Sequence, residues 1–252
     1  MFLHYGFFNF KNMRKTNVQI KQDVFDQYAS EYDAWFMRNQ NLLHSEVALV
    51  AYFLKDTGRT ISIGCGSGLF EHILKKNYDI RIEYGLEPSA SMAEIAEKRG
   101  MKVQVGSVQT SDIGKESYDT VLFNGSPSYI SDLKLAFRKA FNALVRGGKI
   151  VVIDVPKEGS FAILYNLAKT LETWDDLLFE GVKPREVYPI EFVKEARWRT
   201  TPEKIALLEE TGFHDFQFAQ TLTKHPVYAD KEVEIPREGY NQGDYVAICG
   251  IK

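Results

Sequence analysis

Short apolar runs alternate with amphipathic stretches along the first two thirds of the chain. Apolar and aromatic side chains recur close to helical spacing over residues 23–36 and again over 42–54. Strands that alternate with helices of this length are typical of a parallel sheet covered by helices on both faces, so we expect an α/β fold. Strands are predicted at 60–63, 80–86, 102–105, 118–123 and 149–155, and further helices at 69–76, 89–99 and 133–144. A turn at Gly147 and Gly148 is expected to lead into the last of these strands.

The pattern changes after residue 155. Residues 156–199 are rich in aromatic side chains, contain three prolines and show no clear strand. We interpret this segment as a largely helical insertion that forms a lid. A helix capped at Thr200 or Thr201 is then predicted to run through Leu208 and to stop at Gly212. Two final strands, 213–222 and 245–251, are joined by a connection of about twenty residues, which is typical of a functional or mobile loop.

The chain is expected to form one domain over residues 18–252, with the lid at about 156–199. Residues 1–17 are predicted to be a flexible leader, with Met13 as an alternative start. The aromatic-rich first ten residues lack a basic leading region and a cleavage site, so we expect neither a signal peptide nor insertion into a membrane.

Composition and charge narrow the function. The formal net charge of −3 gives no global field toward a phosphate backbone, so no nucleic-acid partner is expected. The two cysteines, Cys65 and Cys249, are too few for a disulfide framework and are predicted to be small core residues. The five histidines show no metal-ligand spacing, so no metal is expected, and a cytoplasmic location fits best.

Candidate chemistry begins at three glycines. Gly64, Gly66 and Gly68 follow a predicted strand and open a helix, which lets backbone approach a ligand at the carboxyl edge of the sheet. Glu87 ends the next predicted strand, where a carboxylate can accept hydrogen bonds from both hydroxyls of a ribose. The alternatives are a tight glycine turn without a ligand and a surface acid before Pro88.

The spacing of the glycines helps to distinguish a site for NAD from a site for S-adenosylmethionine. A dinucleotide-binding turn carries a further glycine or alanine where this chain has Leu69, because its helix packs closely over a pyrophosphate. A ligand without phosphate has no such requirement. The pattern therefore favours S-adenosylmethionine over NAD.

Four segments in this order resemble successive motifs of the class I S-adenosylmethionine-dependent methyltransferases. They are 61–68, 85–89, 118–122 and 144–153, and the likeness extends from about residue 24 to 251. The stretch 25–33 is similar to the N-terminal helix of the small-molecule branch that includes ubiquinone and menaquinone methyltransferases. The resemblance implies a Rossmann-like, seven-stranded sheet, mostly parallel with an antiparallel last strand, and a cofactor across the carboxyl ends of the first two strands.

The resemblance also implies roles for particular residues. Glycines 64, 66 and 68 would line the methionine part of the cofactor and Glu87 would bind the ribose. Ser107 and Val108 would flank the adenine. Asn124 and Gly125 would lie beneath the methyl donor, and Tyr28 and Tyr32 would close over it. The expected cofactor-binding set also includes Cys65, Pro88, Ser89 and Met92. This chain departs from many relatives in carrying Ser62 and Ser107 at positions that often hold an acid, which leaves hydroxyl hydrogen bonds without charge assistance.

The implied function is transfer of a methyl group from S-adenosylmethionine, leaving S-adenosylhomocysteine, to a small-molecule acceptor that the sequence does not identify. A catalytically silent binding module and an aminopropyl-type transferase remain alternatives, and neither the methylated atom nor the oligomeric state is assigned. A base is needed only if the acceptor must lose a proton. The candidates are His225, which is otherwise a surface loop residue, and Asp154, which is otherwise a cap at the end of the fifth strand. The lid aromatics Phe161, Tyr165, Trp174 and Phe179 either line a substrate pocket or pack the lid onto the domain.

Overall fold

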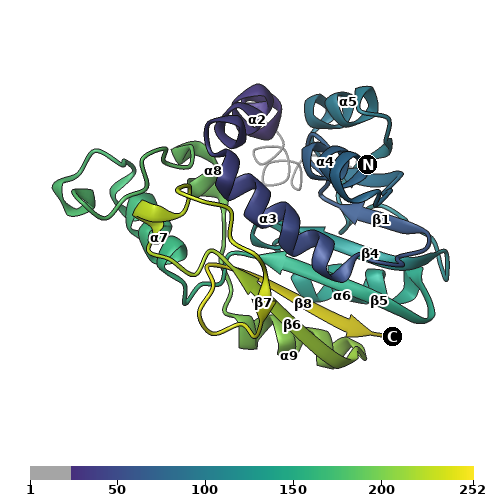
Figure 1. Cartoon of the computed structure of the whole chain (residues 1–252). Helices are drawn as coiled ribbons and strands as arrows, with labels where there is room; N and C mark the ends of the chain where they lie inside the picture. Colours follow the sequence, from purple (N-terminus) through teal and green to yellow (C-terminus); the bar gives the residue numbers. More distant parts are fainter. Residues whose placement is uncertain (1–23) are drawn as a thin grey trace, which may run out of the picture.

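The computed structural model describes residues 24–252, so the leader predicted for residues 1–17 lies outside the described residues. Within this range one mixed sheet runs in the order β3-β2-β1-β4-β5-β8-β6-β7 (Figure 1). Strands β3, β2, β1, β4 and β5 are mutually parallel, and β8 is antiparallel to both β5 and β6. The strands are β1 Thr60–Ile63, β2 Tyr84–Glu87, β3 Lys102–Val105, β4 Tyr118–Asn124, β5 Leu144–Asp154, β6 His214–Thr221, β7 Arg237–Glu238 and β8 Tyr245–Ile251.

The expected Rossmann-like sheet with an antiparallel last strand is confirmed, with one addition. The two-residue edge strand β7 forms inside the segment predicted to be a loop, where it pairs with Ala219 and Gln220 of β6. A strand of this length carries too little pattern to be found by alternation in the sequence.

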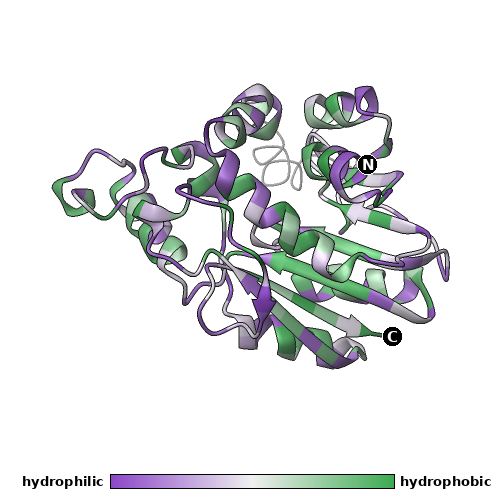
Figure 2. Cartoon of the chain, viewed as in Figure 1, coloured by the Kyte–Doolittle hydropathy of each residue, from purple (hydrophilic) through white to green (hydrophobic). Residues whose placement is uncertain are grey.

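Helices cover both faces of the sheet because successive strand residues point to opposite sides. Leu122 and Val151 join the apolar cluster under α3 and α4, whereas Val121 and Ile150 join the cluster under α6 and α9. The central strands are hydrophobic along most of their length (Figure 2). The helices are α2 Ala29–Arg38, α3 Gln40–Phe53, α4 Leu69–Tyr78, α5 Ala90–Lys98, α6 Leu133–Ala143, α7 Ser160–Leu171, α8 Ile190–Glu195 and α9 Thr201–Thr211. None of the helices described is long and apolar enough to cross a membrane.

Two predicted strand boundaries were wrong. The strand expected from residue 80 begins only at Tyr84, and exposed Arg81 and Glu83 precede it. The turn expected at Gly147 and Gly148 instead lies inside β5. There the backbone of both glycines hydrogen-bonds the backbone of Lys252, and the β4–β5 register shifts between Tyr118 and Thr120. A positive φ of 77° at Gly147 lets the strand continue through this irregularity.

The segment 156–199 is less helical than expected. It contains α7, the single 3₁₀ turn Leu177–Phe179, the short α8 and irregular chain between them. Side-chain hydrogen bonds hold the irregular part, since the Trp174 indole donates to the Tyr188 carbonyl and the Lys183 ammonium donates to the Trp174 carbonyl. Trp174 and Lys183 therefore tie this irregular chain together through its backbone carbonyls, in addition to the backbone hydrogen bonds around the 3₁₀ turn.

Candidate functional site

The glycine turn between β1 and α4 is pressed against the end of β4. Gly64 has a φ of 70°, and a Cβ atom at this position would lie 2.6 Å from the Cβ atom of Ser126. The Gly64 amide donates to the Leu86 carbonyl at 2.7 Å, which ties the turn to β2. Around Gly66 the space is open, because the nearest atom to a Cβ there would be on the Tyr32 ring, at 4.0 Å. A side chain at 64 is thus excluded by packing, and the backbone at 66 is left accessible.

Glu87 joins the glycine turn to the start of α5. Its carboxylate accepts hydrogen bonds from the backbone amides of Gly66 and Ser89, both at 2.9 Å. The side chain is 5% exposed. Burial raises the pKa of Glu87 to about 7, although the two amide hydrogen bonds act in the opposite direction. A buried carboxylate with lone pairs to spare is suited to accept further hydrogen bonds from a ligand.

Two aspartates of the segment 24–38 hold it against this turn. Asp26 accepts hydrogen bonds from the Ser89 hydroxyl and the Ser91 amide. Asp33 accepts from the Ser67 hydroxyl and forms an ion pair with Arg99 at 2.6 Å. These contacts hold α2 above the carboxyl ends of β1 and β2 and bring the Tyr32 ring over Gly66.

A cavity of about 1160 Å³, counting the open space at its mouth, lies between the carboxyl ends of the strands, α2, α3 and the lid. The predicted cofactor residues that line it are Tyr32, Gly64, Gly66, Glu87, Pro88, Met92, Ser107, Val108, Asn124 and Gly125. The structure therefore brings most of that set together around one space.

Four members of the set lie outside the lining. The Cys65 thiol is buried beside Gly85, and Gly68 caps α4. The Ser89 hydroxyl caps α5 by accepting from the Met92 amide, and the Tyr28 ring packs edge-on against Phe192 at 6.4 Å. These residues therefore contact the elements that form the site without lining the cavity themselves.

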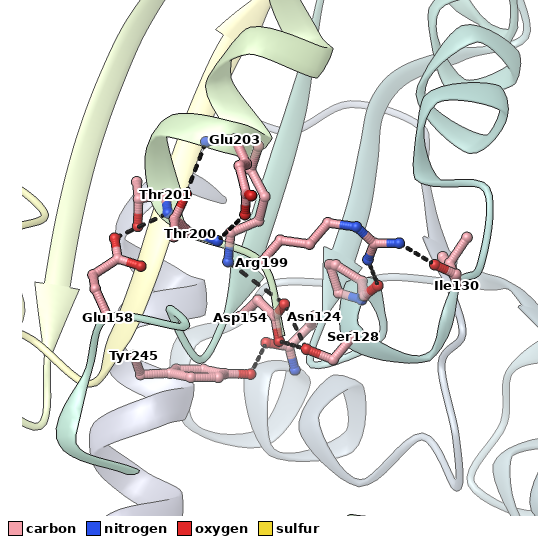
Figure 3. A network of polar contacts seen from close by, with 12 residues as sticks. Asn124, Ser128, Ile130, Asp154, Glu158, Arg199, Thr200, Thr201, Glu203 and Tyr245 are labelled. Carbon is pink, nitrogen blue, oxygen red and sulfur yellow. Dashed lines mark hydrogen bonds and ion pairs between the residues drawn. The ribbon is translucent and has the colours of Figure 1, made fainter. Parts of the chain in front are cut away.

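Of the two base candidates, only Asp154 reaches the cavity. Its carboxylate lies at the end of β5 and accepts from the Ser128 hydroxyl (Figure 3). It also pairs with the buried Lys204 ammonium at 3.5 Å. Burial raises the pKa of Asp154, and the charge of Lys204 opposes that rise. His225 is exposed and is not among the lining residues, and its Nδ1 atom accepts from the Val227 amide within a 3₁₀ turn.

The same region orders the end of β4 and the strands beside it. The Tyr245 hydroxyl of β8 donates to the Asn124 side-chain oxygen at 2.9 Å (Figure 3). Arg199, at the end of the lid, donates to the carbonyls of Pro127, Ile130 and Ser131, so this arginine fixes the loop after β4 rather than facing the cavity.

Sequence reasoning missed Glu46. This residue of α3 lines the cavity and is 7% exposed. The sequence does indicate that Glu46 is buried, because Leu43, Val47 and Val50 lie at helical spacing around it on the apolar face. A charged residue is unusual on such a face. Three lid residues also line the cavity, namely Tyr165, Tyr188 and Trp198, while Trp174 and Phe179 pack in the core.

Comparisons with known proteins agree with this geometry. Residues 61–152 match the family model described as "Methyltransferase domain". A crystal structure from Thermotoga maritima, described as a SAM-dependent methyltransferase and possible histamine N-methyltransferase, is 32% identical with a TM-score of 0.76, covering 91% of this chain and 98% of that one.

Two curated relatives extend the comparison. The uncharacterized protein MJ1123 of Methanocaldococcus jannaschii is 33% identical over 91% of this chain and 99% of its own length. Phosphoethanolamine N-methyltransferase 1 of Triticum aestivum is 22% identical over 91% of this chain and 44% of that protein.

Proposed function

The chain belongs to the class I S-adenosylmethionine-dependent methyltransferases, and we propose that its central cavity holds S-adenosylmethionine and a small-molecule methyl acceptor side by side. The observation that carries the proposal is that the glycine turn, Glu87 and Asn124 line one continuous space together with the lid.

The described residues fit the cofactor. Open backbone at Gly66 would accommodate the methionine part, and the Glu87 carboxylate would accept hydrogen bonds from the ribose. Ser107 and Val108 would flank the adenine, and Asn124 and Gly125 would lie beneath the methyl donor. Cys65, Gly68, Ser89 and Tyr28 would act from outside the lining, by shaping the turn, α5 and α2.

The protein's part in the reaction is placement. The sulfonium supplies the activated methyl group, and the residues of the cavity align the acceptor with it and exclude water. Residues 18–252 would act as one domain, with 156–199 as the lid. Tyr165, Tyr188 and Trp198 close one side of the cavity, which favours an acceptor small enough to be enclosed.

The names of two relatives favour a nitrogen acceptor. The Thermotoga protein is described as a possible histamine N-methyltransferase and the wheat relative as a phosphoethanolamine N-methyltransferase. We extend the proposal to a nitrogen atom on that basis. We also place the enzyme in the cytoplasm, because Cys65 and Cys249 are free thiols, which suits a reducing compartment.

Calorimetric titration with S-adenosylmethionine, S-adenosylhomocysteine and NAD tests the proposed site. We expect the first two ligands to bind and NAD not to bind. Replacement of Gly66 by valine, which introduces a branched side chain at the open backbone position, should abolish binding of both. The matched control is Gly100→Val, since Gly100 follows α5, has a positive φ of 94° as Gly66 has one of 55°, and has no atom within 4 Å of its would-be Cβ. Equal binding by the Gly66 variant would remove the glycine turn from the site.

A further inference from the structure

One buried acid in the cavity is not used by the proposed cofactor site. Glu46 of α3 lines the cavity and is 93% buried, since 7% of its surface is exposed. Within residues 24–252 its carboxylate makes no hydrogen bond or ion pair, and burial raises its pKa to about 8 with no other contribution. A buried carboxyl group without a partner is costly, and a ligand that donates hydrogen bonds or carries a positive charge would offset that cost.

Aromatic side chains surround this acid. Four tyrosines from three parts of the chain line the same cavity as Glu46, and the charge of Glu46 contributes to raising the pKa of each hydroxyl: Tyr32, Tyr165, Tyr188 and Tyr245. The indoles of Trp35 and Trp198 line the same space. Faces of tyrosine and tryptophan rings attract cations, whereas they offer nothing to an anionic group.

All charged side chains that line the cavity within the described residues are acidic. They are Glu46, Glu87 and Asp154. Glu87 is engaged by two backbone amides, and Asp154 by Ser128 and Lys204. Glu46 is the member of the three without such partners, and no lysine, arginine or histidine of the described chain lines the cavity to receive a phosphate or carboxylate.

Resting on the proposed function, we propose that Glu46 and the surrounding aromatic rings form the acceptor subsite, and that the acceptor is a primary or secondary amine without an anionic group. Glu46 releases its proton to water when the ammonium form binds, holds that form by charge, and then receives one of its protons. This assignment accounts for the acid, for the aromatic walls and for the absence of a lining cation in the described chain.

The step balances in atoms and charge. One N–H proton moves from the ammonium to the Glu46 carboxylate, which frees the nitrogen lone pair. The nitrogen forms a bond to the methyl carbon as the carbon–sulfur bond breaks, and that electron pair stays on sulfur. The products are an N-methylammonium ion, neutral Glu46 and S-adenosylhomocysteine, and the Glu46 proton then leaves to water.

Ligand binding to the complete chain tests this proposal without a known substrate. S-adenosylhomocysteine is titrated first, and the complex is then titrated with histamine, 2-phenylethylamine, 2-phenylethanol and phosphoethanolamine, with tryptophan fluorescence as the readout. We expect at least one of the two amines to bind tenfold or more tightly than both the alcohol and phosphoethanolamine. Binding of the alcohol or of phosphoethanolamine as tight as that of the amines, or no binding of either amine, would overturn the proposal.

The outcomes separate the two proposals. Failure of S-adenosylhomocysteine to bind overturns the proposed function and this subsite with it. Binding of S-adenosylhomocysteine without a preference for an amine overturns the subsite alone. The comparison of amine with alcohol uses the native chain, so it decides the question even if a variant does not fold.

The variant Glu46→Gln then assigns the preference to one side chain. We expect it to lose the tenfold preference for the amine while its affinity for S-adenosylhomocysteine changes less than twofold. Glu71→Gln is the matched control, because Glu71 is also a buried helical acid but does not line the cavity. A Glu46→Gln protein that keeps the amine preference, or that loses S-adenosylhomocysteine affinity instead, would contradict the assignment.

Discussion

The Tyr245 hydroxyl donates a 2.9 Å hydrogen bond to the side-chain oxygen of Asn124, across 121 positions of sequence. Asn124 ends β4 and Tyr245 begins β8, and β5 lies between these strands. Both side chains line the cavity. The contact therefore fixes the orientation of the Asn124 amide from the antiparallel part of the sheet, at the position where we propose the methyl donor lies.

Replacing Tyr245 with phenylalanine should lower the turnover number by about tenfold. Loss of one hydrogen bond is worth roughly 0.5–1.5 kcal/mol, and a freed Asn124 amide can rotate away from the orientation that the cavity needs. Methyl-transfer kinetics measure the effect, with Tyr52→Phe at an exposed position of α3 as the control. Unchanged turnover in a folded Tyr245→Phe protein would show that this contact is structural only.

Replacing Glu87 with alanine should weaken S-adenosylmethionine binding by about 1–3 kcal/mol. The variant loses the acceptor for the ribose and also leaves the Gly66 and Ser89 amides without their partner. Calorimetry measures the change, and Glu83→Ala, on the exposed stretch just before β2, is the control. Equal affinity in the folded Glu87 variant would remove this residue from the site.

The pKa of Glu87 near 7 gives this affinity a pH dependence. A carboxylate accepts hydrogen bonds from ribose hydroxyls more strongly when ionised, so binding favours the deprotonated form. The affinity should therefore rise as the pH increases through about 7 and level off above it. The same titration on Glu87→Gln supplies the correction for ionisation of the ligand. A rise that persists unchanged in the variant would exclude Glu87 as its cause.

Much of the fold and of the proposed cofactor site follows from local patterns. The strand before Gly64, the helix that begins at Leu69 and the acid at Glu87 all lie within about 25 residues, so the alternation of apolar runs predicts them. The acceptor side of the cavity is different. Glu46 meets Tyr165 and Tyr245 only after the lid and the last strand have folded back, and no local periodicity encodes that meeting.

The sequence also misled where packing overrides local signals. Two adjacent glycines usually mark a turn, but Gly147 and Gly148 pair with Lys252 and lie inside β5. The position of His225 in a long loop favours it as a catalytic base, yet His225 caps the 3₁₀ turn Pro226–Tyr228 and does not line the cavity. The first error arises because Lys252, the partner of both glycines, lies far along the chain, whereas the second arises because the length of a loop does not tell where its residues point.

Replacing Glu46 with glutamine should stabilise the ligand-free protein at high pH. The pKa of about 8 in the folded state lies above the ordinary value near 4.5, so the folded state holds a proton that the unfolded state has lost. This residue therefore makes stability fall as the pH rises from about 4.5 to about 8. The groups that face it are tyrosines whose own pKa values are raised, so they stay neutral across this range.

The free energy of unfolding should thus differ little between the native protein and Glu46→Gln near pH 4.5. At pH 9 the variant should be more stable by on the order of a few kcal/mol. Urea denaturation at several pH values measures both curves, and Glu87 contributes equally to each. A difference that does not grow with pH would contradict the assignment of an unpartnered carboxylate to Glu46.

Replacing Lys204 with methionine should destabilise the protein by about 3–5 kcal/mol, because it leaves Asp154 buried without its counter-charge. The double variant Asp154→Asn with Lys204→Met should recover much of that loss, since neither charge then remains buried.

Lys134→Met is the matched control at an exposed ion pair. The ion pair of Lys134 with Glu210 is shorter than that of Lys204 with Asp154, at 2.6 Å against 3.5 Å, but both of its side chains are about half exposed. Lys134→Met should therefore cost no more than about 1 kcal/mol, because solvent screens an exposed pair. Urea denaturation of the four proteins decides whether burial or distance governs these pairs, and equal losses for the two lysine variants would refute the argument from burial.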